Sequence, residues 1–352
     1  MNKVLVIGNG FDLYHDRKTR YSDFLSFLES VNNQSVSKVA YNSIQQICVH
    51  HNLEFSKSSL IIFVIKQYID NRNKHNWIDL ESDIKEYIHY LIAFIDEYNS
   101  PKSKKRNTAT SREFYNDETP SEIWRIMESS PSLFDCPSSF VAVPNNEIID
   151  PWGLFNKRKV LAMLENELNC LCSILVYYLK TIEPQIRIKS VAPKPLFLDI
   201  DFDYVISFNY TNTFESTYNS GSAISYIHGN LLKDNIVLGY NDFDNSTDDL
   251  MFKKYYRRLI KQTDTIERTA FYSRSMGVDI KPEVYFFGHS LDISDEDYVK
   301  NIINNADKTI VYYLDEVDRA EKIGNLIKIF GKNDLLKIYN DKVFFKEIPK
   351  SE

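Results

Sequence analysis

The chain begins with a short apolar run that is followed at once by glycine. Residues 3–7 read KVLVI, and Gly8, Asn9 and Gly10 come directly after them. A continuous apolar run of this length suits a strand that is buried on both faces, as the strands of a parallel sheet are. Glycine adopts backbone conformations that other residues rarely reach, so it marks a sharp junction after the strand. An apolar strand that ends at glycines in this way predicts an α/β protein with a mostly parallel sheet.

Strand-like segments return only after residue 200. The later strands are expected at residues 204–208, 223–227, 236–238, 284–287, 309–314 and 342–346. From residue 36 to residue 183 the sequence reads as almost all helix. Apolar residues at spacings of three and four predict helices at residues 60–69, 77–98, 157–182, 251–274, 294–305 and 316–330. Alternation of strand and helix in the last third favours a Rossmann-like, doubly wound sheet flanked by helices.

A sheet built from both ends of the chain implies an insertion between them. The length of 352 residues fits two structural units, or one domain with a large insertion. We therefore expect a Rossmann-like nucleotide-binding domain from residues 1–35 and 195–352, and a large helical insertion domain from residues 36–194. Residues 100–116 are polar and predict a loop, and residues 184–195 predict a connector.

Composition narrows the function classes. Hydrophobic residues make up 43% of the chain and charged residues 26%, as in ordinary globular proteins and unlike disordered ones. The formal charge of −7 argues against a basic nucleic-acid footprint over the whole surface. The four cysteines, at positions 48, 136, 170 and 172, form no C-x-x-C pair, so we expect reduced core thiols and no metal. No leader sequence is evident and the apolar runs are short, which predicts a cytoplasmic protein without a membrane partner.

The first candidate site follows the first strand. The turn from Gly8 to Asp12, with Asn9, Gly10 and Phe11 between them, would present backbone N–H groups to a phosphate. The dinucleotide pattern G-x-G-x-x-G is incomplete, because leucine occupies the third glycine position. A tight turn without a ligand explains the glycines equally well.

Two further candidates follow the middle strands. Asn209 comes after residues 204–208, and its amide could orient a ribose hydroxyl or a water; a turn or helix-cap role is the alternative. His228 ends the segment 223–227 and precedes Gly229. Its ordinary pKa near 6.5 suits a general base, although a structural role is the more frequent one for a single histidine.

The fourth candidate follows residues 284–287. Gly288, His289 and Ser290 repeat the theme of strand, glycine and small polar residue, and could contact a ribose or a phosphate. Asp295 and Asp297 are explained as charges in the first turn of a helix, for which Ser294 and Asp297 have capping-box spacing. All four strand ends would meet at one edge of a parallel sheet, which is the geometry of a nucleotide pocket.

The motif series GNGFD, SFNYT, YIHGN and FFGHSLD resembles the AbiH family of bacterial abortive infection (anti-phage) proteins. Residues 8–24 and the segment WIDLESDI at residues 77–84 are also similar to that family, and the likeness covers nearly the whole chain. It implies a role in antiviral defence, with a phage-derived trigger. We also expect a homo-oligomer.

The same series resembles the sirtuin-like fold more distantly. That resemblance implies that residues 8–10 hold the pyrophosphate of NAD, that Asn209 holds the nicotinamide ribose and a water, and that His228 is the base. Gly288 and Ser290 would contact the adenosine side, with Phe11, Asp12 and His289 completing the nucleotide site. No cysteine lies between Gly229 and Gly288, so the zinc module of sirtuins and protein deacetylation are not expected. The sirtuin-like fold commonly has an aspartate two residues after the asparagine that matches Asn209, and here that position is occupied by Thr211.

Three functions remain open at this point. The first is an enzyme that consumes NAD as its substrate by cleaving the nicotinamide–ribose bond. The second is a nuclease or nucleotidyl hydrolase that holds RNA with basic residues 253–258 and a loop near Lys104. The third is a non-catalytic nucleotide sensor. Glu81 would be an acid or base if it faces the pocket, but we expect a surface charge.

Overall fold

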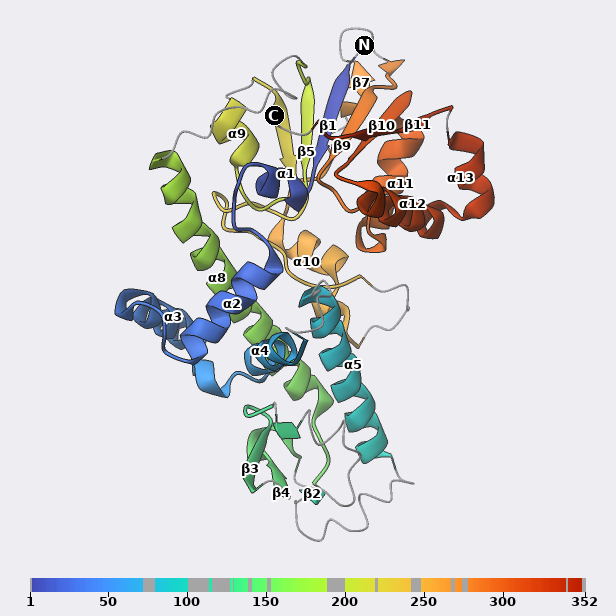
Figure 1. Cartoon of the computed structure of the whole chain (residues 1–352). Coiled ribbons are helices and arrows are strands. Elements are labelled where there is room, and N and C mark those ends of the chain that lie inside the picture. The colour runs from blue at the N-terminus through green and yellow to red at the C-terminus, as the bar shows by residue number, and fades with distance from the viewer. Residues whose placement is uncertain are drawn as a thin grey trace.

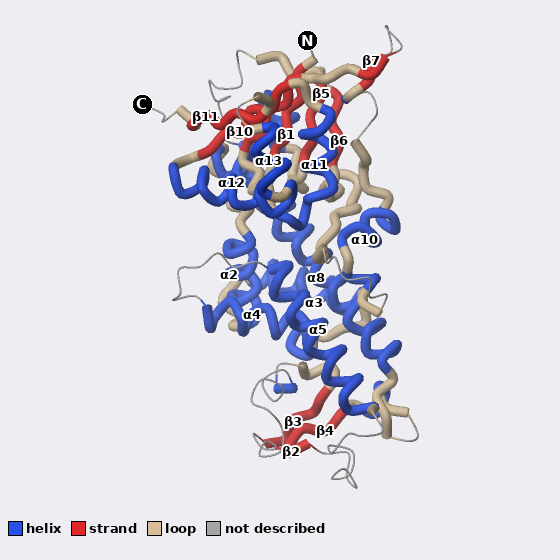
Figure 2. Tube along the Cα trace, turned by 90° about the vertical axis from the view of Figure 1, so that its right-hand side faces the viewer, coloured by secondary structure: helices blue, strands red, loops and turns tan. Residues whose placement is uncertain are grey.

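The computed structural model describes residues 2–71, 80–100, 114–115, 127–128, 130–138, 141–150, 153–188, 200–218, 221–241, 248–266, 270–273, 278–339 and 341–349. A twisted sheet with helices on both faces lies at one end of the molecule, and a layer of helices lies beneath it (Figure 1). A small second sheet lies at the opposite end, beyond the helices (Figure 2).

The large sheet has six strands in the order β11-β10-β9-β1-β5-β6, and every neighbouring pair is parallel. Counted along the chain within this sheet, the order is 3-2-1-4-5-6, which is that of a doubly wound Rossmann-like fold. The predicted fold class is confirmed. The strand β1 occupies the middle, with Val6 beside Ile206 on one side and Phe286 on the other. The strands are β1 (Lys3–Ile7), β5 (Tyr204–Ser207), β6 (Ala223–Tyr226), β9 (Glu283–Phe287), β10 (Lys308–Tyr313) and β11 (Val343–Glu347).

Both faces of this sheet are covered, which explains why its central strand is apolar from Val4 to Ile7. Val4 and Val6 pack into the core under α11, α12 and α13, whereas Leu5 and Ile7 pack into the core on the opposite face, where α1 and α9 lie. Successive side chains of a strand point to opposite faces, so only a continuous apolar run buries both. The covering helices are α1 (Asn9–Tyr14), α9 (Thr213–Tyr218), α11 (Glu296–Asn305), α12 (Glu316–Phe330) and α13 (Lys332–Ile338).

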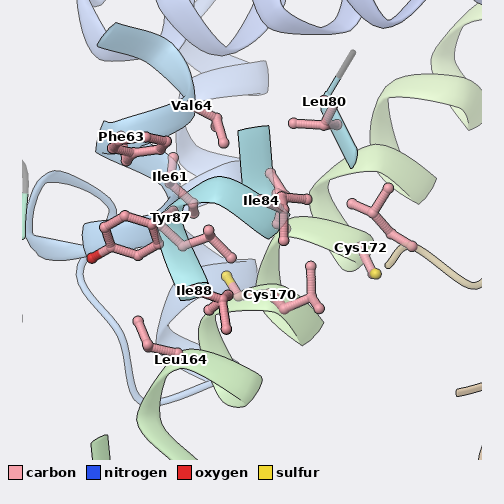
Figure 3. Close-up of a cluster of buried hydrophobic side chains, with 14 of the residues drawn as sticks. Ile61, Phe63, Val64, Leu80, Ile84, Tyr87, Ile88, Leu164, Cys170 and Cys172 are labelled. Atoms are coloured by element: carbon pink, nitrogen blue, oxygen red, sulfur yellow. The ribbon is translucent and has the colours of Figure 1, made fainter. Parts of the chain in front are cut away.

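The helical layer has a core of its own. Buried residues from the five helices that the structure describes in this layer form one cluster, part of which Figure 3 shows around Ile84, Ile88 and Cys170. Cys48, Cys170 and Cys172 are buried free thiols, as expected, while the side chain of Cys136 lies outside the described residues. The helices are α2 (Tyr21–Asn32), α3 (Lys38–His50), α4 (Ser59–Asn71), α5 (Leu80–Asn99) and α8 (Lys157–Ile188).

One described helix is long and apolar enough to cross a membrane by length and composition alone. It is the part of α8 from Lys157 to Thr181, with a mean hydropathy of 1.4 over its best window. Of that window, 56% is buried inside the protein, where α8 packs against α3 and α4. Core helices pass the same test, and α8 is placed as one.

Several sequence predictions were wrong in detail. The region expected to be all helical also holds an antiparallel sheet of β2 (Phe114–Tyr115), β3 (Phe134–Ser138) and β4 (Val141–Pro144). Residues 236–238 are buried but form no strand, because Ile236 and Leu238 pack into the helical core instead. The connector predicted from residue 184 starts too early, since α8 continues to residue 188.

The helix expected over residues 251–274 is much shorter. The helix α10 (Lys254–Lys261) ends at Gln262, whose φ of 50° takes the backbone into the left-handed region. Beyond it, residues 272–273 form the short strand β7, paired with β8 (Val278–Asp279). Most of the predicted 100–116 loop, the start of the helix expected from residue 77 and residues 189–199 lie outside the described residues.

Candidate functional site

The turns after β1 and β9 meet at the carboxyl edge of the sheet. These strands are neighbours, and the chain winds away from them in opposite directions, so this is the switch point where open α/β sheets bind ligands. Gly10 N–H donates to the carbonyl of Gly288 at 2.8 Å. Gly288 has a φ of +65°, and a Cβ there would lie 2.2 Å from the backbone nitrogen of Phe11. The glycines allow the two turns to touch.

Asn209 joins the end of β5 to the same place. Its Nδ2 donates to the carbonyl of Gly8 at 3.0 Å, and the residue is 5% exposed. Thr211, two residues on, donates from its hydroxyl to Oδ2 of the buried Asp12 at 2.6 Å. The predicted site residues from three strands therefore lie together, held by contacts among themselves.

The other residues predicted for the nucleotide site lie in different surroundings. Oδ1 of Asn9 accepts a hydrogen bond from the hydroxyl of Thr19 at 2.6 Å. Phe11 is completely buried in the core on the α1 and α9 face. Ser290 is exposed, and its carbonyl accepts from Nδ2 of Asn325 at 3.1 Å. A role for these residues in nucleotide binding stays a prediction.

His228 and His289 lie beside one carboxylate that the sequence analysis assigned to a helix turn. Nε2 of His228 is 3.2 Å from Oδ1 of Asp295, and Nε2 of His289 is 3.6 Å from Oδ2 of the same residue. Nδ1 of His289 accepts from the backbone N–H of Leu291 at 2.9 Å, which places the ring hydrogen on Nε2, toward Asp295. Phe208 packs against both imidazoles, with ring centroids 5.3 Å and 4.3 Å away.

Asp295 occupies a helix-capping position without capping. It is the N-cap residue of α11, yet its side chain makes no cap hydrogen bond. Aspartate is favoured at this position because its oxygen usually accepts from the first turn of the helix. The expected capping pair of Ser294 and Asp297 is also wrong, because Asp292 accepts from the backbone N–H of Ser294 instead. The carboxylate of Asp295 is thereby left to the histidines.

Basic residues reach the same cluster from α10. Lys254 is 4% exposed and pairs with Glu81 of α5 at 2.6 Å, so the expectation that Glu81 is a surface charge was wrong. Nη2 of Arg258 lies 3.9 Å from Oδ1 of Asp295. In Figure 1, α10 lies between the sheet and the helical layer, which explains why its cations are enclosed. They can form no open RNA-binding surface, so that part of the RNA hypothesis loses its support.

Burial and charge set the protonation of the cluster. Burial lowers the pKa of both His228 and His289 to about 4, against an opposing effect of Asp295. Burial alone would raise the pKa of Asp295, but Lys254 and the two imidazoles outweigh it and hold the pKa well below its ordinary value. Burial would lower the pKa of Lys254, but Glu81 and Asp295 raise it overall. At neutral pH the carboxylate and the ammonium are charged and the imidazoles are neutral.

From the sequence, Asp295 was expected only as a charge in a helix turn, and Lys254 and Arg258 only as RNA contacts, whereas Glu81 was a candidate acid or base if it faced the pocket. One available signal was the composition of residues 253–258, KKYYRR, since a cluster of cations beside apolar residues fits burial at an interface as well as exposure. Among the described residues, no group of three or more histidines, cysteines or acidic residues is arranged to hold a metal ion.

The sequence model of the family described as "Bacteriophage abortive infection AbiH" matches residues 4–314. No curated protein and no solved structure gave a significant match. The matched range contains every residue of the cluster described above.

Proposed function

Because the chain belongs to the AbiH family of bacteriophage abortive infection proteins, we propose that it arrests infected cells by hydrolysing NAD at the switch point of its sheet. The observation that carries the proposal is the convergence of four segments at that edge. The turns at Gly8 and Gly288, with Asn209 and His228, come from strands that are distant in sequence, and Asp295 joins them.

The protonation of the cluster suits cleavage of the nicotinamide–ribose bond. As that bond breaks, nicotinamide leaves with the bonding electron pair and positive charge develops on the ribose. The ionised carboxylate of Asp295, in a buried site, would stabilise this charge. A water would attack the anomeric carbon, and the neutral imidazole of His228 would take its proton.

The histidine is prepared for this task only in part. A pKa near 4 makes the imidazole of His228 a weak base in the free protein. General bases work best with a pKa near the operating pH. A bound substrate with a pyrophosphate would raise the pKa of His228, because a nearby negative charge favours the protonated imidazole. The base would gain strength when the substrate arrives.

The remaining expectations form part of the same proposal. The effector would act in the cytoplasm on NAD, respond to a phage-derived trigger and assemble as a homo-oligomer. Residues 36–194, which hold most of the helical layer, would form the insertion domain that receives the trigger. The ion pair between Lys254 and Glu81 supports such a link, because it joins α10 beside the site to α5 of that layer.

The test is direct measurement of NAD loss. The purified full-length chain is incubated with NAD, with and without lysate of phage-infected cells, and nicotinamide release is followed by chromatography. We expect release by the wild type, a loss of at least about 100-fold in His228→Ala, and no change in His50→Ala, which alters an exposed histidine of α3. Intact NAD under every condition would refute hydrolysis, and bound but intact NAD would favour the sensor.

A further inference from the structure

We propose that Asp295, Arg258 and His228 form a subsite for the vicinal hydroxyls of a ribose. The inference rests on the proposed binding of a nucleotide at this edge of the sheet. It adds Asp295 and Arg258 to the ribose contact that the sirtuin-like resemblance implies for Asn209, and it names the two hydroxyls as the groups that these side chains bind.

The first observation is a group of unsatisfied polar atoms. Asp295 is 8% exposed, Arg258 is 9% exposed and His228 is 6% exposed, so each residue is more than nine-tenths buried. Oδ1 of Asp295, Nε and Nη2 of Arg258 and Nδ1 of His228 have no hydrogen-bond partner among the described residues. Nε2 of His228 lies 3.2 Å from Oδ1 of Asp295, and Nη2 of Arg258 lies 3.9 Å from the same oxygen, so both groups face this carboxylate without satisfying its full hydrogen-bonding capacity. Buried polar atoms without partners are costly, so several in one place indicate a missing ligand or water.

The second observation is that the side chains are held in place. The guanidinium of Arg258 lies over the ring of Tyr298, 4.8 Å from its centroid. Stacking occupies the face of the guanidinium and leaves its N–H donors directed sideways, in its plane. Asp295 is fixed at the start of α11 without serving as its cap. Both groups are therefore positioned by contacts that do not use their hydrogen-bonding atoms.

The charge balance decides which ligand group fits. Lys254 and Arg258 carry positive charge, Glu81 and Asp295 carry negative charge, and the imidazoles are neutral at pH 7. The cluster has no excess positive charge to hold a phosphate. Its free atoms are an acceptor on Asp295 and donors on Arg258. A hydroxyl donates and accepts at once, and two adjacent hydroxyls would bind both side chains.

The test uses a ligand that undergoes no cleavage. Binding of adenosine 5′-diphosphoribose is compared by calorimetry with binding of its analogue that lacks the 2- and 3-hydroxyls of the terminal ribose. We expect the hydroxyls to strengthen binding by about tenfold or more in the wild type, since their loss leaves the buried polar atoms unpaired. The ratio should fall to within about twofold in Asp295→Asn and in Arg258→Met. Thermal unfolding of each variant confirms that it is folded.

The matched control is Asp297→Asn, which changes an exposed carboxylate of the same helix and should keep the wild-type ratio. The inference would be overturned if the wild type bound the two ligands equally, or if the ratio of their binding constants were unchanged in both site variants. The unpartnered polar atoms of the cluster would then bind water alone. The outcome is independent of hydrolysis: a hydroxyl-dependent ratio without NAD loss would retain the subsite and reject the enzyme.

Discussion

Nδ2 of Asn209 donates a 3.0 Å hydrogen bond to the carbonyl oxygen of Gly8, 201 residues earlier in the chain. This hydrogen bond links the end of β5 to the end of β1, which are neighbouring strands beside the switch point. A side chain that the sequence suggests for holding a water or a ribose thus also holds the site together. Its loss has two consequences that must be separated.

Asn209→Ala is expected to lower the free energy of unfolding by about 0.5–1.5 kcal/mol, because the Gly8 carbonyl loses the Asn209 amide and keeps only the backbone N–H of Phe11 as its donor. Urea denaturation measures the change. If the variant shows full stability, the bond contributes nothing; if it is destabilised but folded at 25 °C, any loss of NAD hydrolysis can be assigned to the site.

Gly288→Ala is expected to prevent correct folding or to destabilise the protein severely. A methyl group there would meet the Phe11 backbone nitrogen at 2.2 Å, and the φ of +65° is unfavourable for alanine. Gly324→Ala in α12 is the matched control, since nothing lies within 4 Å of its added Cβ. Alanine should stabilise that helix by roughly 0.5–1 kcal/mol. Equal melting temperatures for the two variants would contradict the packing of the turns.

Acidification should destabilise the fold between pH 6.5 and pH 4. The pKa of His228 and of His289 is about 4 in the folded protein, below the ordinary 6.5, so the unfolded chain binds protons first as the pH falls. Each imidazole then lowers the free energy of unfolding by up to about 1.4 kcal/mol for every pH unit of acidification. Among the charges that face the two imidazoles, Asp295 and Asp292 raise the pKa, whereas Lys254, Arg258 and Lys322 lower it.

Unfolding free energies at pH 7, 6 and 5 measure this effect. His289→Gln should flatten the decline, because glutamine takes up no proton in either state. A wild-type stability that is the same at pH 5 as at pH 7 would show that the imidazoles are not buried as described.

Lys254→Met should cost about 3–5 kcal/mol, since it leaves the largely buried carboxylate of Glu81 without its cation. Replacing both residues, as Lys254→Met with Glu81→Leu, should recover part of the loss because the charge of Glu81 is removed together with its partner, while Asp295 still loses the attraction of Lys254. The control is Lys57→Met. The ion pair of Lys57 with Glu54 is largely exposed, so its loss should change the free energy of unfolding only slightly. Chemical denaturation of all four proteins distinguishes a buried pair from a surface one.

The sheet could be predicted from sequence because its strands are local and apolar. Residues 3–7 and 316–330 match the observed β1 and α12 to the residue. A strand buried on both faces and an amphipathic helix each leave a periodic pattern in the sequence. The segment 236–238 has the same apolar pattern but packs as an irregular segment, and periodicity in three residues cannot distinguish the two.

The site could be predicted only where it lies at strand ends. Gly8, Asn209, His228 and Gly288 follow strands, and parallel strands bring their ends together. Asp295 and Arg258 depend on the packing of helices whose relative positions no local pattern encodes. Lys254 and Arg258 of α10 are therefore expected at the surface unless the positions of Glu81 and Asp295 are already known.

The central position of β1 also governs how the protein is made. The first strand to leave the ribosome has β5 and β9 as neighbours, and β9 begins at Glu283. At roughly 5–20 residues per second, translation needs about 15–55 s to reach that point. Until then the turn at Gly8 can contact Asn209 but not the turn at Gly288, so a nascent or prematurely terminated chain carries no complete site. The topology itself makes completion of the candidate site depend on synthesis of β9.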